Sequence, residues 1–147
     1  MLNDHSAIPG FLESKKLTQK FIYDTPLWKD SRDITDDDRK MLLKIIEKDS
    51  SQKIIITHGT YTLAETARFL KEHLSKIKQT IIFTGSLIPL VGYKNSDAPE
   101  NLLYALEQIS SLPWGVYVCM NKKTFLAEEA AKDLKTGQFY LAFKNKY

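Results

Sequence analysis

One stretch of the chain, residues 54–68, shows the pattern of a strand, a tight turn and a helix in succession. It opens with the β-branched run Ile-Ile-Ile at 54–56, which is typical of a strand buried on both faces. Gly59 allows a sharp turn, and Thr62 followed by Glu65 predicts a capping box at the start of a helix. Residues 58–61 are therefore expected where a strand ends and a helix begins. In an open parallel sheet ligands bind there, and backbone N–H groups at a helix start favour anions.

The rest of the chain alternates strand and helix patterns in the same way. We expect strands at 21–23, 53–57, 80–84 and 115–120, a short edge strand or ordered tail at 138–143, and helices at 8–15, 35–48, 63–77, from 96 or 97 to before 113, and 126–135. Segment 85–95 is expected to be irregular, and Gly137 is expected to stop the last helix. This alternation predicts an α/β fold, a three-layer Rossmann-like open sheet that is mostly parallel, with helices on both faces.

This pattern also predicts how the strands are arranged. The strands near Ile54, Ile81 and Val116 should be parallel neighbours in one sheet. Because the carboxyl ends of parallel strands meet at one edge, Thr60 and Gly85 should lie together at that edge.

Composition excludes several classes of function. The 147 residues suffice for a single domain, and the net charge of +3 comes with no basic run interleaved with aromatic residues, so we expect no nucleic-acid partner. The single cysteine, Cys119, lies in an apolar strand, which predicts a reduced core thiol, excludes a disulfide scaffold and favours a cytoplasmic setting. We find no signal-peptide core, membrane-spanning segment, metal-ligand spacing or phosphate-binding glycine loop, so we expect no membrane, metal or cofactor.

Four segments of the chain resemble the L-asparaginase family, in the order that the family has them. The segments are His-Gly-Thr-Tyr-Thr at 58–62 with the Glu-Thr-Ala helix after it, Asp-Ser-Arg-Asp-Ile-Thr at 30–35, Thr-Gly-Ser-Leu-Ile-Pro at 84–89 with Ser-Asp-Ala-Pro-Glu-Asn-Leu at 96–102, and Gly-Val-Tyr-Val-Cys-Met-Asn at 115–121. The matching span runs from about residue 20 to the end. The resemblance implies hydrolysis of the side-chain amide of a small amino acid or a related amide.

The resemblance also implies a role for individual residues. Thr60 and Lys132 match two members of a catalytic group in which lysine takes the proton of the threonine hydroxyl. Asp30 and Ser31 match the substrate clamp of the family. Further substrate contacts are implied for four residues, Gly59, Tyr61, Gly85 and Ser86, with the two glycine turns facing an oxyanion or carboxylate. A small amide or amino-acid substrate and a homo-oligomer are the partners that the family implies.

Two departures from the family pattern weaken the expected chemistry. The family carries a Gly-Gly-Thr turn after its first strand, whose threonine is usually the nucleophile, and no Gly-Gly-Thr occurs in this sequence. We therefore expect one domain over 1–147 without the first strand and without a second domain, with a gap in its sheet that another segment or chain would fill. Tyr61 stands where the family has Asp, and a neutral phenol cannot replace a carboxylate that binds the substrate ammonium.

Other interpretations of these residues stay open at this point. Asp30 also suits loop capping before Thr35, and Lys132 also suits a solvated helix position paired with Glu128. His58 is expected to be structural, and Asp97 to anchor or cap the helix that follows it. Two functions therefore compete: an amidohydrolase that is impaired in this chain, and a degenerate domain without catalysis that binds a small acid, an amide or a partner chain.

Overall fold

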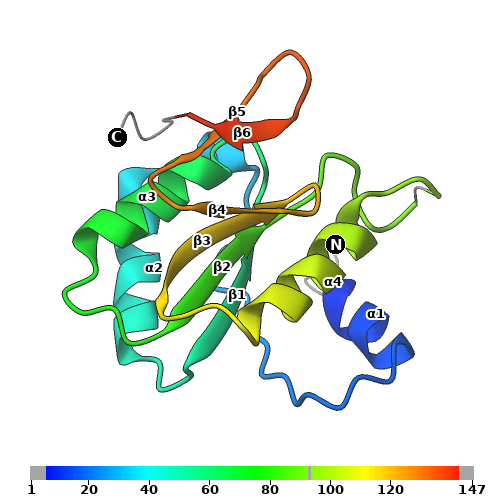
Figure 1. The fold of residues 1–147 in the computed structure, drawn as a ribbon, viewed down its shortest axis with the longest axis horizontal. Coiled ribbons are helices and arrows are strands. Elements are labelled where there is room, and N and C mark those ends of the chain that lie inside the picture. The colour runs from blue at the N-terminus through cyan, green and yellow to red at the C-terminus, as the bar shows by residue number, and fades with distance from the viewer. Residues whose placement is uncertain (1–5, 93, 143–147) are drawn as a thin grey trace.

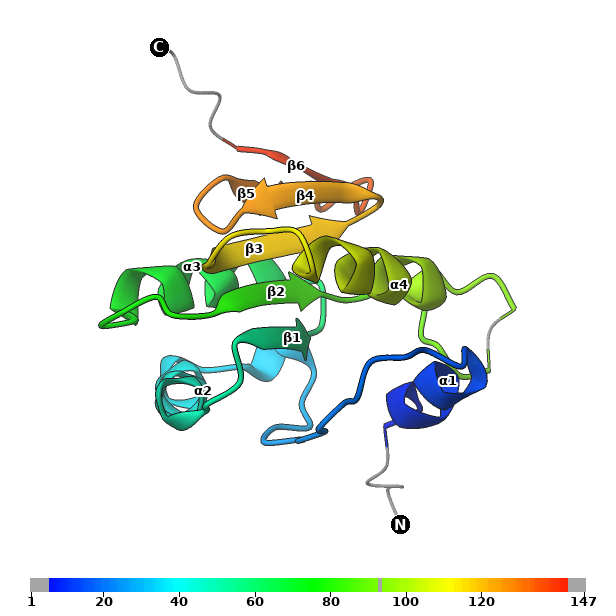
Figure 2. The same ribbon diagram turned by 60° about the horizontal axis from the view of Figure 1, so that its bottom comes forward.

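The computed structural model describes residues 6–92 and 94–142 and has three layers (Figures 1 and 2). The central sheet has the order β1-β2-β3-β4, and β5 and β6 form a separate hairpin. The strands are β1 (Lys53–Thr57), β2 (Thr80–Thr84), β3 (Gly115–Met120), β4 (Lys123–Leu126), β5 (Ala130–Lys132) and β6 (Phe139–Leu141); the helices are α1 (Ile8–Ser14), η1 (Ser31–Asp33), α2 (Asp36–Lys48), α3 (Leu63–His73) and α4 (Ala98–Ile109). The fold class expected from the sequence is confirmed.

The strand pairing agrees with the sequence prediction. The β1–β2 and β2–β3 pairs are parallel, with Ile54 opposite Ile81 and Ile81 opposite Val116, whereas β4 returns antiparallel to β3. All residues of β2 and β3 are buried, as their continuous apolar sequence requires. Cys119 is free and buried, and burial raises the pKa of its thiol to about 11, so it is an unreactive core residue at neutral pH.

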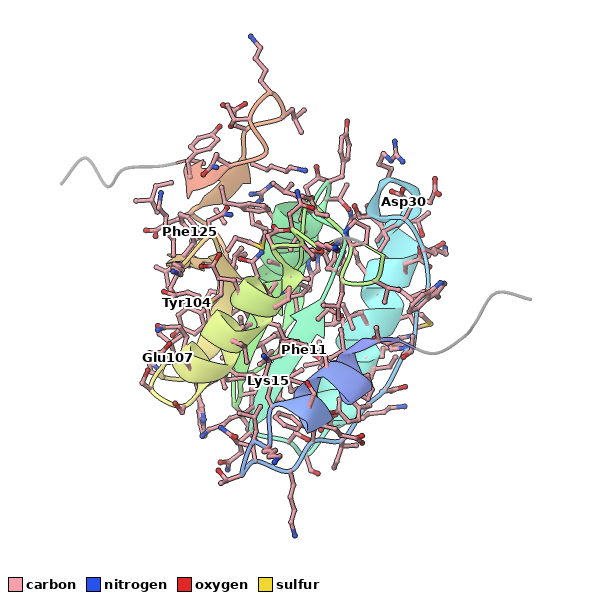
Figure 3. All side chains as sticks on the ribbon, turned by 90° about the vertical axis from the view of Figure 1, so that its right-hand side faces the viewer. Phe11, Lys15, Asp30, Tyr104, Glu107 and Phe125 are labelled. Atoms are coloured by element: carbon pink, nitrogen blue, oxygen red, sulfur yellow. The ribbon has the colours of Figure 1, made fainter. Side chains whose placement is uncertain are left out.

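Helices cover both faces of this sheet. The larger core cluster joins Ile46 of α2 and the buried face of α3 to residues of β2 and β3 such as Phe83 and Val118. On the other face α4 packs through Ala105 against Ile82. Helix α1 packs in turn against α4, and the two helices lie side by side in Figure 3. The carboxyl ends of β1 and β2 lie at one edge of this sheet, where each strand is followed by a turn.

Sheet edge β1 is open in the part of the chain that the structure describes. Among the described residues, β1 pairs with β2 on one side and with no strand on the other. The strand predicted at 21–23 is wrong, because this segment has no regular structure. Its Ile22 is 94% exposed, and without a neighbouring strand the segment has no ladder in which to pair.

The helix predicted at 126–135 is also wrong, and Gly137 does not stop a helix. The chain instead turns at Asn121 and Lys122, which both have positive φ, and returns as β4. It then continues into β5, while Gly137, with φ of +73°, lies in the turn that leads to β6. Burial of Phe125, Ala127 and Ala130 in the main core outweighs the helix propensity of the Glu-Glu-Ala-Ala run. The edge strand predicted at 138–143 is confirmed as β6; residue 143 lies outside the described residues.

Helix starts follow the sequence in one case and depart from it in another. Thr35 caps α2 with a capping box, in which its hydroxyl accepts from the Asp38 N–H and the Asp38 carboxylate accepts from the Thr35 N–H. The capping box predicted for Thr62 and Glu65 is wrong. The Thr62 hydroxyl donates to the Ser31 carbonyl at 2.6 Å, so it links two loops and does not cap α3, which ends at His73 and not at 77. Helices α1 and α4 begin and end close to their predicted limits.

Candidate active site at the carboxyl ends of the strands

The turns after β1 and β2 touch one another at the carboxyl edge of the sheet. A Cβ atom added at Gly85 would collide with the His58 carbonyl oxygen and would lie 3.3 Å from Cγ2 of Thr60. Gly59 is equally confined, because a Cβ there would lie 2.7 Å from Cβ of Ser31. Both glycines are therefore required by close approach, and the predicted position of Thr60 and Gly85 at one edge is confirmed.

Lys132 and Thr60 meet at this edge, although 72 positions separate them in the sequence. The Lys132 ammonium donates to Oγ1 of Thr60 at 2.8 Å. Thr60 is buried, and burial lowers the pKa of the Lys132 amine below its ordinary value. Lys132 reaches Thr60 from strand β5 and not from a helix, so the alternative of a solvated helix lysine paired with Glu128 is wrong.

Tyr61 lies beside this pair and is half exposed. The Lys132 nitrogen lies 5.9 Å from the centroid of the Tyr61 ring, which is within the range of a cation–π contact. The ring attracts the ammonium but offers no negative charge to a substrate amine. The contact therefore favours the charged form of Lys132, in opposition to the burial that lowers its pKa.

Loop 30–33 brings Ser31, but not the Asp30 carboxylate, against the turn. Ser31 is buried, and its Oγ accepts a long hydrogen bond of 3.4 Å from the Thr62 N–H. The Asp30 carboxylate accepts from the Arg32 N–H and from its guanidinium, at 2.8–3.1 Å. These bonds lower the pKa of Asp30 to about 2, so it is ionised and engaged by Arg32. This is the loop-capping arrangement that the sequence left open. Ser86 follows Gly85, is half-buried, and has no hydrogen-bonded partner among the described side chains.

Asn101 of α4 forms hydrogen bonds to three segments around the site, and it was not predicted from the sequence. Its amide donates to the Gly85 carbonyl at 2.9 Å and to Asp97 at 3.1 Å, and its oxygen accepts from the Asn121 N–H at 3.0 Å. Asn101 is buried, and buried amides are hydrogen-bonded. An amide residue on the otherwise apolar face of α4 is therefore the sequence feature that could have identified it. Asp97 does not cap α4; its carboxylate accepts from the N–H groups of Leu87 and Ile88 and so anchors the irregular segment.

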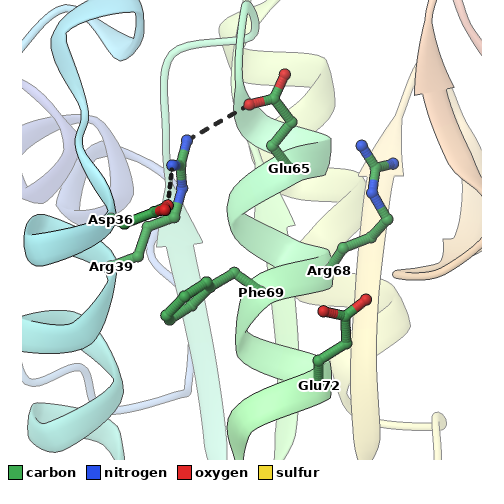
Figure 4. Close-up of a pocket in the computed structure, with 6 residues that line it drawn as sticks. All are labelled: Asp36, Arg39, Glu65, Arg68, Phe69 and Glu72. Carbon is green, nitrogen blue, oxygen red and sulfur yellow. Dashed lines mark hydrogen bonds and ion pairs between the residues drawn. The ribbon is translucent and has the colours of Figure 1, made fainter.

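A separate groove of about 240 Å³ lies between α2 and α3, and contains none of the predicted site residues. Figure 4 shows the six residues that line it, Asp36, Arg39, Glu65, Arg68, Phe69 and Glu72. Within residues 6–92 and 94–142 no group of three acidic, histidine or cysteine side chains is placed to hold a metal ion. Over the same residues no helix has the length and apolar character needed to cross a membrane.

Comparison with known proteins decides the family. The family described as "Asparaginase, N-terminal" matches residues 6–145 of this chain. The chain belongs to the asparaginase family. It is 31% identical over 136 residues to the glutaminase-asparaginase of Acinetobacter glutaminasificans, a match that covers 90% of this chain and 38% of that protein. It is 38% identical over 91 residues to L-asparaginase 1 of Escherichia coli K12, which covers 60% of this chain and 26% of that protein.

Solved structures of the asparaginase family share the fold. The thermostable L-asparaginase from Thermococcus kodakarensis superposes with a TM-score of 0.79 at 29% identity, over 92% of this chain and 43% of that one. The L-asparaginase I from Vibrio cholerae superposes with a TM-score of 0.74 at 29% identity, over 82% of this chain and 38% of that one. This chain therefore spans less than half the length of these asparaginases, and it has the fold of their amino-terminal domain.

Proposed function

We propose that this asparaginase-family domain binds and hydrolyses the side-chain amide of a small amino acid, with a rate limited by the two departures from the family pattern. The observation that carries the proposal is the 2.8 Å hydrogen bond between Lys132 and the buried hydroxyl of Thr60. A lysine amine with a lowered pKa beside a hydroxyl is the arrangement that proton transfer requires.

The proposed reaction uses the pair as a proton relay. In its neutral form Lys132 accepts the Thr60 proton while the Thr60 oxygen accepts a proton from an attacking water. The water oxygen forms a bond to the amide carbon, and the C–N bond then breaks. The proton held by Lys132 returns through Thr60 to the leaving nitrogen, so that water and an amide give a carboxylic acid and ammonia. Backbone N–H groups of the turns at Gly59 and Gly85 are proposed to face the substrate oxygens, and Ser31 to border them.

Tyr61 and the absence of a Gly-Gly-Thr turn from these 147 residues are proposed to keep the rate of this chain low. Without a carboxylate at 61, the contact to a substrate ammonium is lost, which costs about 1.5–3 kcal/mol when the group is desolvated. The same two features support the alternative, a domain that binds a small acid or amide without turnover. The proposal also includes assembly as a homo-oligomer and a cytoplasmic setting, which the family resemblance and the single buried thiol support.

Ammonia release from L-asparagine and L-glutamine tests this proposal. We expect weak release by the wild-type chain, at least tenfold weaker after Thr60→Val or Lys132→Met, and unchanged after Lys135→Met, an exposed lysine in the turn after β5. Tyr61→Asp should raise release only modestly, because the larger defect remains. Release that is insensitive to both Thr60→Val and Lys132→Met would contradict the proposal. Binding of L-asparagine without any release would favour the alternative.

A further inference from the structure

A series of hydrogen bonds, buried at Thr66 and exposed at Gly59, runs from helix α2 through α3 to the turn that carries Thr60. Nε of Arg39 donates to Oγ1 of Thr66 at 3.0 Å, and Nε2 of His58 lies 3.0 Å from the same hydroxyl. Nδ1 of His58 lies 2.7 Å from the Gly59 carbonyl oxygen. Arg39 and Thr66 are both buried, with Thr66 1% exposed, so these polar groups have no water to replace their partners.

We propose that Arg39 and Thr66 are positioning residues for Thr60, and that they act through His58 and the Gly59 carbonyl. The inference rests on the proposed function, because it deepens the account of the Thr60–Lys132 pair. None of the side chains in this series of hydrogen bonds touches a substrate in the proposal; their effect is to hold one peptide plane.

With a neutral His58 ring, only one direction of donation satisfies every atom in this series of hydrogen bonds. A guanidinium can only donate, so the Thr66 oxygen accepts from Arg39 and its single proton points to His58. His58 Nε2 must then accept, which places the ring proton on Nδ1, where it donates to the Gly59 carbonyl. The neutral ring agrees with burial, which lowers the pKa of His58.

At the α2 end of this series of hydrogen bonds, Arg39 also forms ion pairs with two carboxylates. The Arg39 guanidinium pairs with Asp36 at 2.9 Å and with Glu65 at 3.6 Å, and Figure 4 shows both pairs among the residues that line the groove between α2 and α3. Asp36 and Glu65 are themselves exposed, so these pairs contribute little energy. The buried bond from Nε to Thr66 is the contact that orients the guanidinium.

At the near end, the held carbonyl determines the placement of Thr60. The Gly59 carbonyl and the Thr60 N–H belong to one planar trans peptide, so fixing the oxygen also fixes the direction of the N–H. Ser31 lies against Gly59, and the turn at Gly85 lies against the His58 carbonyl and the Thr60 methyl group, so the residues on either side of this peptide are also confined. A peptide held in this way keeps the Thr60 hydroxyl at the 2.8 Å distance from Lys132.

Thr66→Val is the sharp test, because it keeps the branched shape and removes the hydroxyl. Thr66→Ser restores the hydroxyl and serves as the rescue. Thr80→Val is the matched control, since Thr80 is a buried threonine that donates to the Leu112 carbonyl at 3.2 Å near the amino end of β2. Two NMR readouts that need no turnover are used: the tautomer of His58 from its ring nitrogens, and the titration of the Lys132 side chain.

We expect the wild-type His58 ring to carry its proton on Nδ1. Thr66→Val should lower the pKa of Lys132 further, because the ammonium loses its hydrogen bond to Thr60 while its burial remains. Thr66→Ser and Thr80→Val should leave this pKa at its wild-type value. A wild-type proton on Nε2, or a Lys132 titration that Thr66→Val does not move, would overturn the inference. If Thr66→Val does not fold, the wild-type tautomer still decides. Absence of ammonia release would count against the proposed function and leave these readouts intact.

Discussion

At the scale of single residues, the site depends on two positions that have no side chain, Gly59 and Gly85. Gly59 and Gly85 allow three chain segments to approach more closely than side chains permit. The approach brings the Thr60 methyl group against the second turn and leaves its hydroxyl to Lys132. The sequence motif contained these glycines, but only the structure shows that Ser31 and the His58 carbonyl are the groups they accommodate.

The first prediction concerns Gly85. Gly85→Ala should lower the free energy of unfolding by about 1–3 kcal/mol, because the new Cβ meets backbone that has no room to move. Gly10→Ala is the control, since nothing lies within 4 Å of that position and alanine in helix α1 should add about 0.5–1 kcal/mol. Urea unfolding of the two variants measures both values. Equal stability of the two variants would show that the turns are not in close contact.

At the scale of elements, the antiparallel return of β4 carries the chain toward Lys132. The turn between β3 and β4 places Asn121 and Lys122 at φ of 54° and 56°, the geometry of the hairpin turn that favours Asn-Gly. Lysine is an unfavourable residue at the second of these positions. The side chain of Lys122 forms an ion pair with Glu100 at 2.8 Å, but both partners are exposed and the pair contributes little.

The second prediction follows from this turn. Lys122→Gly should raise the free energy of unfolding by about 0.5–1 kcal/mol, because glycine adopts positive φ without the steric cost borne by other residues. Lys123→Gly, one position further and inside β4, should lower it by a similar amount. Chemical denaturation of both variants gives the comparison. A loss of stability in Lys122→Gly equal to that in Lys123→Gly would contradict the assigned turn.

The elements also show where sequence reasoning succeeds and where it fails. Strands β1, β2 and β3 were predicted to the residue, because continuous β-branched or apolar runs between turn signals have few other readings. The 126–135 segment failed because its composition favours a helix, whereas its buried positions pair and pack as strands. Segment 21–23 failed for the opposite reason, since a strand pattern without a neighbour forms no ladder. The Thr60–Lys132 contact came from the family resemblance; Asn101 and the Arg39–Thr66 bond required the coordinates.

At the scale of the whole molecule, the site forms because a small hairpin docks on the main sheet. Phe139 and Ala130 of the hairpin are buried in the main core, and Nη1 of Arg68 in α3 donates to the Ala130 carbonyl at 2.8 Å. These contacts place Lys132 above the end of β1. Global stability and the geometry of the site are therefore linked, and conditions that change one should change the other.

The third prediction concerns the pH dependence of stability. Burial lowers the pKa of His58 in the folded chain, so the unfolded chain binds more protons than the folded one. The stabilisation is complete above the unfolded histidine pKa of about 6.5 and is lost as the pH falls through the folded value. Between pH 7.5 and 5 the free energy of unfolding should decrease. The decrease should be smaller in His58→Asn. Parallel slopes for wild type and His58→Asn would contradict this account.

The most direct test of the central claim, that the carboxyl edge of the sheet is an asparaginase-type substrate site, is a titration of the ¹⁵N-labelled wild-type chain with L-asparagine and L-aspartate. Such a titration detects binding with or without turnover. We predict saturable shifts of the backbone amides of Ser31, Gly59, Thr60 and Gly85, with a weakened response in Lys132→Met. Shifts confined to the groove between α2 and α3, or no saturable shift at the Thr60 turn, would contradict it.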